Sequence, residues 1–307
     1  MTALAPATAS ASPVRPETVR LVAEDGYPIM ATLYPGSPVG TARLLVAGAT
    51  GVPQAFYRRF AEHASAKGFT TMTLDYRGIG LSRPASLRGF RMDYRDWARL
   101  DLAAAVEVLY DKDQPLYMVG HSYGGHAFGL LPNHARVAAF YTFATGAGWH
   151  GWMPPRERAR VWLMWNVVGP VLTTATGYLS WSRLGMGEDL PIDVYLQWKR
   201  WCRYPDYFFG DAAARDSLAG FAQVRTPIMA ANALDDLWAP PRSRDAFMAG
   251  YCNAPLTTLD IDPQSAGLGP IGHMGYFKAR AQPLWDAALH WLDQHRAAAP
   301  AAAARPA

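Results

Sequence analysis

The stretch LYMVGHSYGG, residues 116–125, decides the fold of this chain. Its first four residues are apolar, as in a buried parallel strand, and the residues that follow, 126–131, are predicted to form a helix. Gly-x-Ser-x-Gly between a strand and a helix is the pattern of a nucleophile elbow, a sharp turn that exposes its serine. Side chains at Gly120 and Gly124 would collide with the flanking strand and helix. The helix would also direct unpaired N–H groups at the oxygen of Ser122, which is therefore a candidate nucleophile.

Strand and helix patterns alternate on both sides of this stretch. Apolar or alternating runs predict strands at 17–24, 28–34, 42–47, 69–74, 137–143, 227–232 and 256–261. Helical patterns lie at 57–67, 96–109, 242–251 and 283–296. The first two strands are joined at Asp25-Gly26, which is a hairpin signal. Such alternation predicts an α/β fold, with a mostly parallel eight-stranded sheet, right-handed crossovers and flanking helices.

The alternation stops at Gly146 and resumes near Thr226. Seven of the chain's 11 tryptophans lie between them: Trp149, Trp152, Trp162, Trp165, Trp181, Trp198 and Trp201. We therefore expect a helical, aromatic-rich cap (lid) subdomain at 146–220, inserted into a core domain formed by 17–145 and 221–296. Trp149, Trp152, Trp162 and Trp165 are its candidate substrate-binding residues. In the alternative interpretation, these aromatic side chains form only the core of the cap.

Residues 161–182 contain no charge, and a run of this length could span a membrane. However, the run holds several polar residues, and Gly169-Pro170 is predicted to break a helix near its middle. Two short cap helices fit this pattern better than an integral membrane span.

Composition restricts the remaining classes of protein. The net charge of +4 is mild for 307 residues, and no basic stripe with interleaved aromatic residues suggests nucleic-acid binding. Cys202 and Cys252 are far apart, which fits a reducing compartment and gives no metal-ligand spacing. The low-complexity ends, 1–16 and 297–307, are expected to be disordered, and the first of them lacks the pattern of a signal peptide. These features predict a cytoplasmic protein.

A carboxylate after a late strand and a histidine after the last strand complete a possible catalytic constellation. The carboxylate is Asp235 or Asp236, and the histidine is His273. Serine, acid and histidine in this order are the triad order of α/β-hydrolases. Four motifs carry a resemblance to that superfamily over roughly residues 19–291: GATG at 48–51, DYRGIGLS at 75–82, GHSYG at 120–124 and GH at 272–273. The sequence is most similar to the bacterial serine-aminopeptidase and monoacylglycerol-lipase-like branch, within a group described only as predicted hydrolases.

The resemblance implies a role for each residue of the constellation. Ser122 would attack a carbonyl carbon and His273 would accept its proton. Asp236 is chosen as the acid because family members commonly place a proline four residues later, where Pro240 stands; Asp235 would then cap the next turn or face solvent.

Two backbone N–H groups would form the oxyanion hole. Tyr123, the residue after the nucleophile, would provide the first. The resemblance implies Ala49 for the second, although Ala47-Gly48 stands where the family commonly has His-Gly.

The expected activity is that of a serine hydrolase that cleaves a carboxylic ester of an apolar acyl group through an acyl-enzyme. Acyl transfer, thioester hydrolysis or peptide hydrolysis by the same triad are alternatives, as is a ligand-binding protein without catalysis. The expected partner is a small-molecule acyl substrate. Neither a cofactor nor a metal is expected, and His121 and His126 are interpreted as structural residues.

Overall fold

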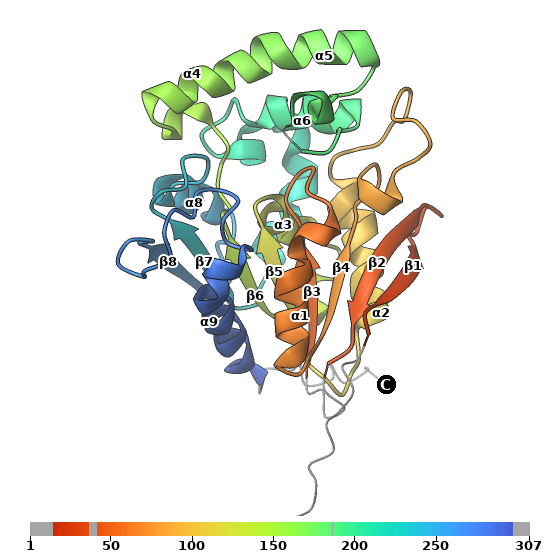
Figure 1. Cartoon of the computed structure of the whole chain (residues 1–307), viewed down its shortest axis with the longest axis vertical. Helices are drawn as coiled ribbons and strands as arrows, with labels where there is room; N and C mark the ends of the chain where they lie inside the picture. The colour runs from red at the N-terminus through yellow and green to blue at the C-terminus, as the bar shows by residue number, and fades with distance from the viewer. Residues whose placement is uncertain (1–14, 37–41, 186, 297–307) are drawn as a thin grey trace, which may run out of the picture.

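The computed structural model describes residues 15–296 except 37–41 and 186 (Figure 1). The predicted disordered ends, 1–16 and 297–307, lie outside the described residues apart from Arg15 and Pro16.

Eight strands form one sheet in the order β1-β2-β4-β3-β5-β6-β7-β8. Their bounds are β1 Glu17–Val22, β2 Pro28–Tyr34, β3 Ala42–Ala47, β4 Phe69–Leu74, β5 Leu116–His121, β6 Val137–Phe143, β7 Ile228–Ala233 and β8 Leu256–Ile261. The pairs β1–β2 and β2–β4 are antiparallel, and all the others are parallel. The prediction of an α/β fold with a mostly parallel eight-stranded sheet is confirmed.

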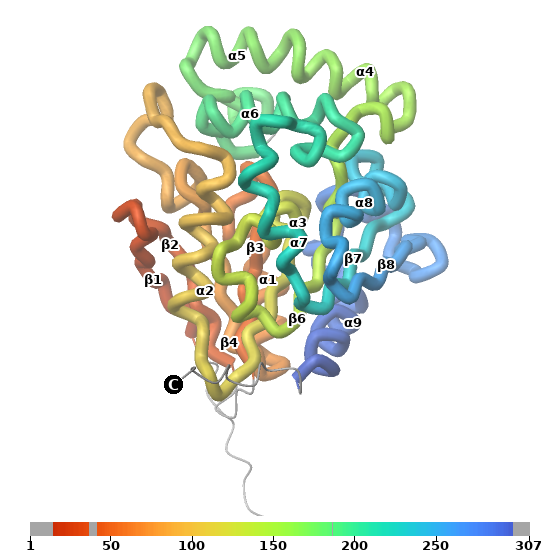
Figure 2. Tube along the Cα trace, turned by 180° about the vertical axis from the view of Figure 1, so that it is seen from behind, coloured from red at the N-terminus to blue at the C-terminus, as the bar shows by residue number. Residues whose placement is uncertain are grey.

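Helices cover both faces of this sheet, so the central strands β5 and β6 are buried along their whole length. Helices α1 (Arg58–Ala66) and α9 (Gln282–Asp293) cover the face seen in Figure 1. Helices α2 (Ala103–Leu109), α3 (Tyr123–Ala127), α7 (Ala219–Gln223) and α8 (Pro241–Met248) lie on the other face (Figure 2). Burial on both faces is the reason that these strands are continuous apolar runs in the sequence.

Most of the segment between β6 and β7 lies over the carboxyl ends of the parallel strands (Figure 1). The helices there are α4 (Pro155–Leu163), α5 (Gly169–Thr176) and α6 (Ile192–Trp201), whereas α7, at the end of the same segment, packs on the sheet. A π-helical stretch, η7 (Met164–Val168), joins α4 to α5. Short 3-10 turns complete the segment: η6 (His150–Trp152), η8 (Trp181–Leu184), η9 (Tyr207–Gly210) and η10 (Ala212–Leu218).

The remaining short elements lie outside the segment between β6 and β7. The 3-10 turns are η1 (Gln54–Tyr57), η2 (Gly80–Ser82), η4 (Phe128–Leu130), η5 (His134–Arg136) and η11 (Ala279–Ala281). A second π-helical stretch, η3 (Trp97–Leu102), leads directly into α2.

The helix predicted to break at Gly169-Pro170 continues past that point. Pro170 stands in the first turn of α5, and the wider turns of η7 precede it. The α-helical, π-helical and α-helical turns of α4, η7 and α5 thus follow one another without an interruption at Pro170. Among the described residues, no helix is both long enough and apolar enough to cross a membrane.

Candidate active site

The elbow at Ser122 has the backbone geometry that its glycines imply. Ser122 has φ 52° and ψ −107°, a conformation that residues with side chains rarely adopt. A Cβ atom on Gly124 would lie 2.1 Å from the carbonyl oxygen of Ala47, and one on Gly120 would lie 2.7 Å from the carbonyl carbon of Gly124. The turn therefore requires glycine at both positions, as the sequence pattern predicted.

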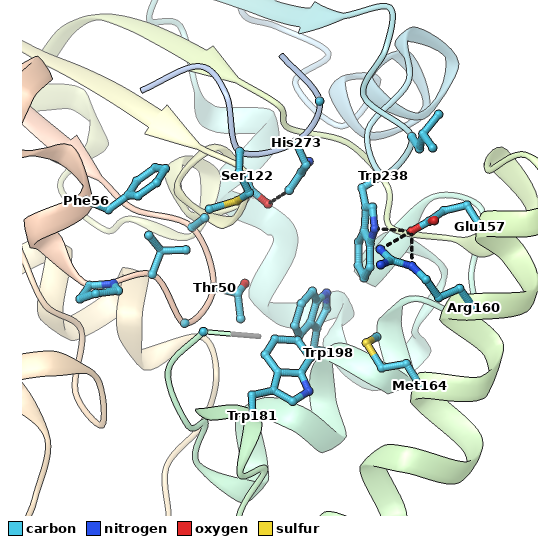
Figure 3. Close-up of a pocket in the computed structure, with 18 of the residues that line it drawn as sticks. Thr50, Phe56, Ser122, Glu157, Arg160, Met164, Trp181, Trp198, Trp238 and His273 are labelled. Atoms are coloured by element: carbon cyan, nitrogen blue, oxygen red, sulfur yellow. Dashed lines mark hydrogen bonds and ion pairs between the residues drawn. The ribbon is translucent and has the colours of Figure 1, made fainter. Parts of the chain in front are cut away.

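The side chains of Ser122, His273 and Asp236 form a continuous line of hydrogen bonds. Nε2 of His273 lies 3.0 Å from Oγ of Ser122, and Nδ1 lies 2.9 and 3.1 Å from the two carboxylate oxygens of Asp236. An ionised carboxylate only accepts, so Nδ1 carries the proton of a neutral imidazole. Nε2 is then free to accept the hydroxyl proton of Ser122 (Figure 3).

The carboxylate of Asp236 is completely buried but well supported. Burial acts to raise its pKa, yet the interactions with His273 and the backbone hydrogen bonds that the carboxylate accepts outweigh this, so the pKa lies below its ordinary value. The backbone N–H groups of Trp238 and Ala239 each donate to Oδ1 at 3.0 Å. Asp236 is therefore held as an anion beside the imidazole.

Asp235 holds the loop that carries His273. Its two carboxylate oxygens accept the backbone N–H groups of Ile271, at 2.8 Å, and Gly272, at 3.0 Å. The sequence left this residue either capping the next turn or facing solvent. The structure instead shows it bonded to Ile271 and Gly272, the two residues directly before His273.

The two predicted oxyanion donors differ in their surroundings. Tyr123 begins α3, and within the described part of the chain its N–H group has no protein acceptor. The N–H group of Ala49, however, donates a 2.7 Å hydrogen bond to the buried hydroxyl of Tyr57. The assignment of Ala49 to the oxyanion hole is therefore inconsistent with the structure, because its hydrogen is already used.

Thr50 is the neighbouring residue on the same loop. It lines the pocket that contains Ser122, and its side chain is hydrogen-bonded to the hydroxyl of Tyr94. No acceptor for its backbone N–H group occurs among the residues that the structure describes.

The buried histidines His121 and His126 bind backbone carbonyl groups. Nε2 of His121 lies 2.9 Å from the carbonyl oxygen of His273, and Nε2 of His126 lies 2.8 Å from that of Gly146. Burial lowers the pKa of His121 to about 3 and that of His126 to about 4. In the described ranges, no three His, Cys, Asp or Glu side chains are grouped as metal ligands would be.

A cavity of about 770 Å³ opens beside Ser122 and His273 (Figure 3). Apolar and aromatic side chains form most of its wall: Val52, Pro53, Phe56, Met164, Trp181, Trp198, Leu237, Trp238 and Met274. Its charged lining residues are Glu157, Arg160 and Asp235. The cavity is suited to an uncharged, apolar group next to Ser122.

The four tryptophans predicted to contact substrate do not line this cavity. Trp162 is 54% exposed on α4, and Trp165 packs against Tyr195 and Trp198. Trp149 and Trp152 pack against each other edge to face. The structure therefore does not bring these residues to the cavity beside Ser122, because one face of the insertion packs on itself and another faces solvent.

Trp181 and Trp198 of the insertion and Trp238 of the core take the predicted place in the cavity wall. The first two belong to the tryptophan cluster that the sequence singled out. Trp238 lies outside it, although its position two residues after Asp236 was an available signal.

Comparisons with known proteins bear on the fold of this chain. A family model described as serine aminopeptidase, S33, matches residues 44–177. No curated protein matches the chain. Among solved structures, a soluble variant of monoglyceride lipase from Saccharomyces cerevisiae is 18% identical, with a TM-score of 0.62 and coverage of 95% of this chain and 99% of that one.

Two further structures show how widely the fold is shared. A haloalkane dehalogenase variant from Bradyrhizobium elkanii is 13% identical, with a TM-score of 0.62 and coverage of 92% and 98% of the two chains. An esterase from Pyrococcus furiosus is 12% identical, with a TM-score of 0.57 and coverage of 91% and 92%. The sheet order and these structural matches show that this chain has the α/β-hydrolase fold.

Proposed function

We propose that this protein is a serine hydrolase that cleaves carboxylic esters of apolar acyl groups. The observation that carries the proposal is the hydrogen-bonded line from Ser122 through His273 to Asp236, which opens into an apolar cavity. The chemistry needs a nucleophile, a base that can accept its proton and a group that orients the base, and these three side chains have the required contacts.

Ester cleavage would proceed in two stages. The Ser122 hydroxyl attacks the ester carbonyl while its proton passes to Nε2 of His273, and the negative charge of Asp236 stabilises the imidazolium. The proton then passes to the departing alkoxide, which leaves as an alcohol, and the acyl group stays on the serine. Water, deprotonated by His273, releases the acid in the second stage.

The oxyanion that forms in both stages would accept backbone hydrogen bonds from Tyr123 and Thr50. Thr50 replaces Ala49 in this role because the Ala49 N–H group is bound to Tyr57. Both proposed donors adjoin the cavity: Thr50 lines it, and Tyr123 directly follows Ser122. Such donors typically contribute about 10²- to 10³-fold to kcat.

The segment 146–220 would act as a lid subdomain over the acyl group. Met164, Trp181 and Trp198 of this segment line the cavity, opposite core residues such as Phe56. The named activity of one structural relative, monoglyceride lipase, fits an acyl substrate of this kind.

The family match to serine aminopeptidases makes peptide hydrolysis the second candidate. An amino-terminal substrate needs a free carboxylate to bind its ammonium group. Of the two lining carboxylates, Glu157 is bound to Arg160 and Trp238, and Asp235 is bound to the backbone of the His273 loop. These contacts favour an uncharged acyl group over a charged amino terminus.

The test compares matched substrates that share a hexanoyl group: an aryl ester, an aryl thioester and an anilide. Ester cleavage that produces free hexanoic acid, and that is lost in Ser122→Ala, is the expected result. Cleavage of the anilide only, or of no substrate, would overturn the proposal. Added alcohols separate hydrolysis from acyl transfer, since transfer would yield a new ester in place of the acid.

A further inference from the structure

A buried chain of three hydrogen bonds links the loop after β3 to the loop that carries His273. The backbone N–H of Ala49 donates to the hydroxyl of Tyr57 at 2.7 Å. That hydroxyl lies 2.9 Å from Nδ1 of His121, and Nε2 of His121 lies 2.9 Å from the carbonyl oxygen of His273. Tyr57 is 1% exposed and His121 is completely buried, so water does not compete for these contacts.

Only one arrangement of protons satisfies the whole chain. A carbonyl oxygen cannot donate, so Nε2 of His121 must carry a proton. Burial and the nearby His273 lower the pKa of His121 to about 3, so the ring is neutral and Nδ1 is an acceptor. The hydroxyl of Tyr57 must then donate to Nδ1, and its oxygen accepts the N–H of Ala49. Each bond fixes the direction of the next.

The ends of this chain adjoin the reacting groups. Ala49 precedes Thr50, the proposed oxyanion donor, and His121 precedes Ser122. The far end binds the backbone of His273 itself. A Cβ atom on Gly48 would lie 2.9 Å from the ring of Tyr57, so glycine at this position permits the close approach of the tyrosine. The aromatic rings of Phe56 and Phe277 pack around His121 and limit its movement.

We propose that His121 is a positioning residue which, together with Tyr57, holds the oxyanion loop and the His273 loop at a fixed separation. This inference rests on the proposed hydrolase function. Its effect is on the transition state, because the oxyanion donor and the base must both be in place as charge develops. Misplacement of reacting groups by about 1 Å can lower the rate about 100-fold.

Tyr57→Phe is the most direct test, because it removes one hydroxyl and keeps the ring. We expect kcat for an aryl ester to fall by about 10- to 100-fold while KM changes by less than about twofold. Affinity for a trifluoromethyl ketone, which forms a tetrahedral adduct with an active serine, should fall in parallel with kcat/KM. A role in stability alone would lower the melting temperature without changing either quantity.

Tyr195→Phe is the matched control, since it also removes a buried tyrosine hydroxyl, one that donates instead to the backbone carbonyl of Trp165 at 3.0 Å. It should resemble Tyr57→Phe in melting temperature but keep wild-type kcat. His121→Gln retains a donor and an acceptor and should preserve more activity than His121→Leu. If the leucine variant does not fold, the comparison of Tyr57→Phe with Tyr195→Phe still tests the positioning role.

An active wild type with an equally active, folded Tyr57→Phe variant would overturn the positioning role and leave the proposed function intact. A wild type without hydrolytic activity would contradict both the positioning role and the proposed function. A kcat loss that is equal in Tyr57→Phe and Tyr195→Phe would also contradict the inference, because it would show a general response to a lost buried hydrogen bond.

Discussion

The indole N–H of Trp238 donates a 2.8 Å hydrogen bond to the carboxylate of Glu157, and this bond joins the loop after β7 to helix α4 (Figure 3). Glu157 also pairs with Arg160 at 2.7 Å. The backbone N–H of Trp238 donates a separate hydrogen bond to the carboxylate of Asp236. One residue thus contacts both the inserted segment and the proposed catalytic acid, and its side chain forms part of the cavity wall.

Replacing Trp238 with phenylalanine should weaken substrate binding more than chemistry. The variant loses the bond to Glu157 but keeps the backbone bond to Asp236. A hydrogen bond to a charged group contributes at least about 1 kcal/mol, so we expect KM for a hexanoyl aryl ester to rise about fivefold or more, with kcat within about threefold. Michaelis kinetics measure both. Glu157→Gln, which keeps an acceptor for the indole, should have the smaller effect, and a KM that is unchanged in Trp238→Phe would refute this account.

The two neighbouring aspartates should differ sharply in their effects on turnover. Asp236→Asn would hold His273 in the wrong tautomer and should lower kcat by up to ~10⁴-fold, by analogy with serine proteases. Asp235→Asn weakens the bonds to Ile271 and Gly272, so it should lower the melting temperature and affect kcat less. Kinetics and thermal melts of both variants provide the comparison. A larger kcat loss in Asp235→Asn would reverse the assignment.

Most of the fold could be predicted from local sequence signals. Each central strand is buried on both faces and is therefore an apolar run, and the elbow glycines are required by contacts with Ala47 and with each other. Ser122, Asp236 and His273 each follow a predicted strand, so the parallel sheet brings them to the same edge. The structure places all three within hydrogen-bonding distance, and their catalytic roles remain a prediction.

The parts that could not be predicted depend on contacts between distant loops. Whether the N–H of Ala49 is free depends on where the ring of Tyr57 lies, and no local pattern specifies that. In the inserted segment, a π-helical stretch changes the helical period after Leu163, so spacing alone could not separate the exposed Trp162 from the buried Trp165.

Acyl-chain length should control the rate if the cavity binds the acyl group. Each methylene that enters the cavity should contribute ~0.8 kcal/mol, or about fourfold in kcat/KM, until the space is full. Aryl esters from acetate to dodecanoate should therefore show a rise, a maximum at intermediate length and a decline. A flat profile, or a steady decrease from acetate, would remove the acyl-binding role of the cavity.

The buried histidines should make folding stability sensitive to mild acid. His121 and His126 have folded-state pKa values of about 3 and about 4, below the ~6.5 of an unfolded histidine. At these two groups the unfolded chain therefore binds more protons below about pH 6.5, so their contribution to stability should fall as the pH drops from about 6.5 toward 4. Each group contributes up to about 1.4 kcal/mol per pH unit.

Urea unfolding at pH 7, 6 and 5 measures this dependence. His126→Gln should reduce the slope of unfolding free energy against pH by about half of the histidine contribution. An identical slope in wild type and His126→Gln would show that this imidazole is not buried in the neutral form.

The central claim is that Ser122 is an activated nucleophile, and reaction with a fluorophosphonate probe followed by intact-protein and peptide mass spectrometry tests it most directly. Wild-type protein should gain one adduct, located on Ser122, within minutes at low probe concentration. Folded Ser122→Ala should gain none, and its ester hydrolysis should fall by several orders of magnitude. A folded wild type that stays unlabelled, an adduct on another residue, or a Ser122→Ala variant that keeps a tenth of wild-type turnover would contradict the account.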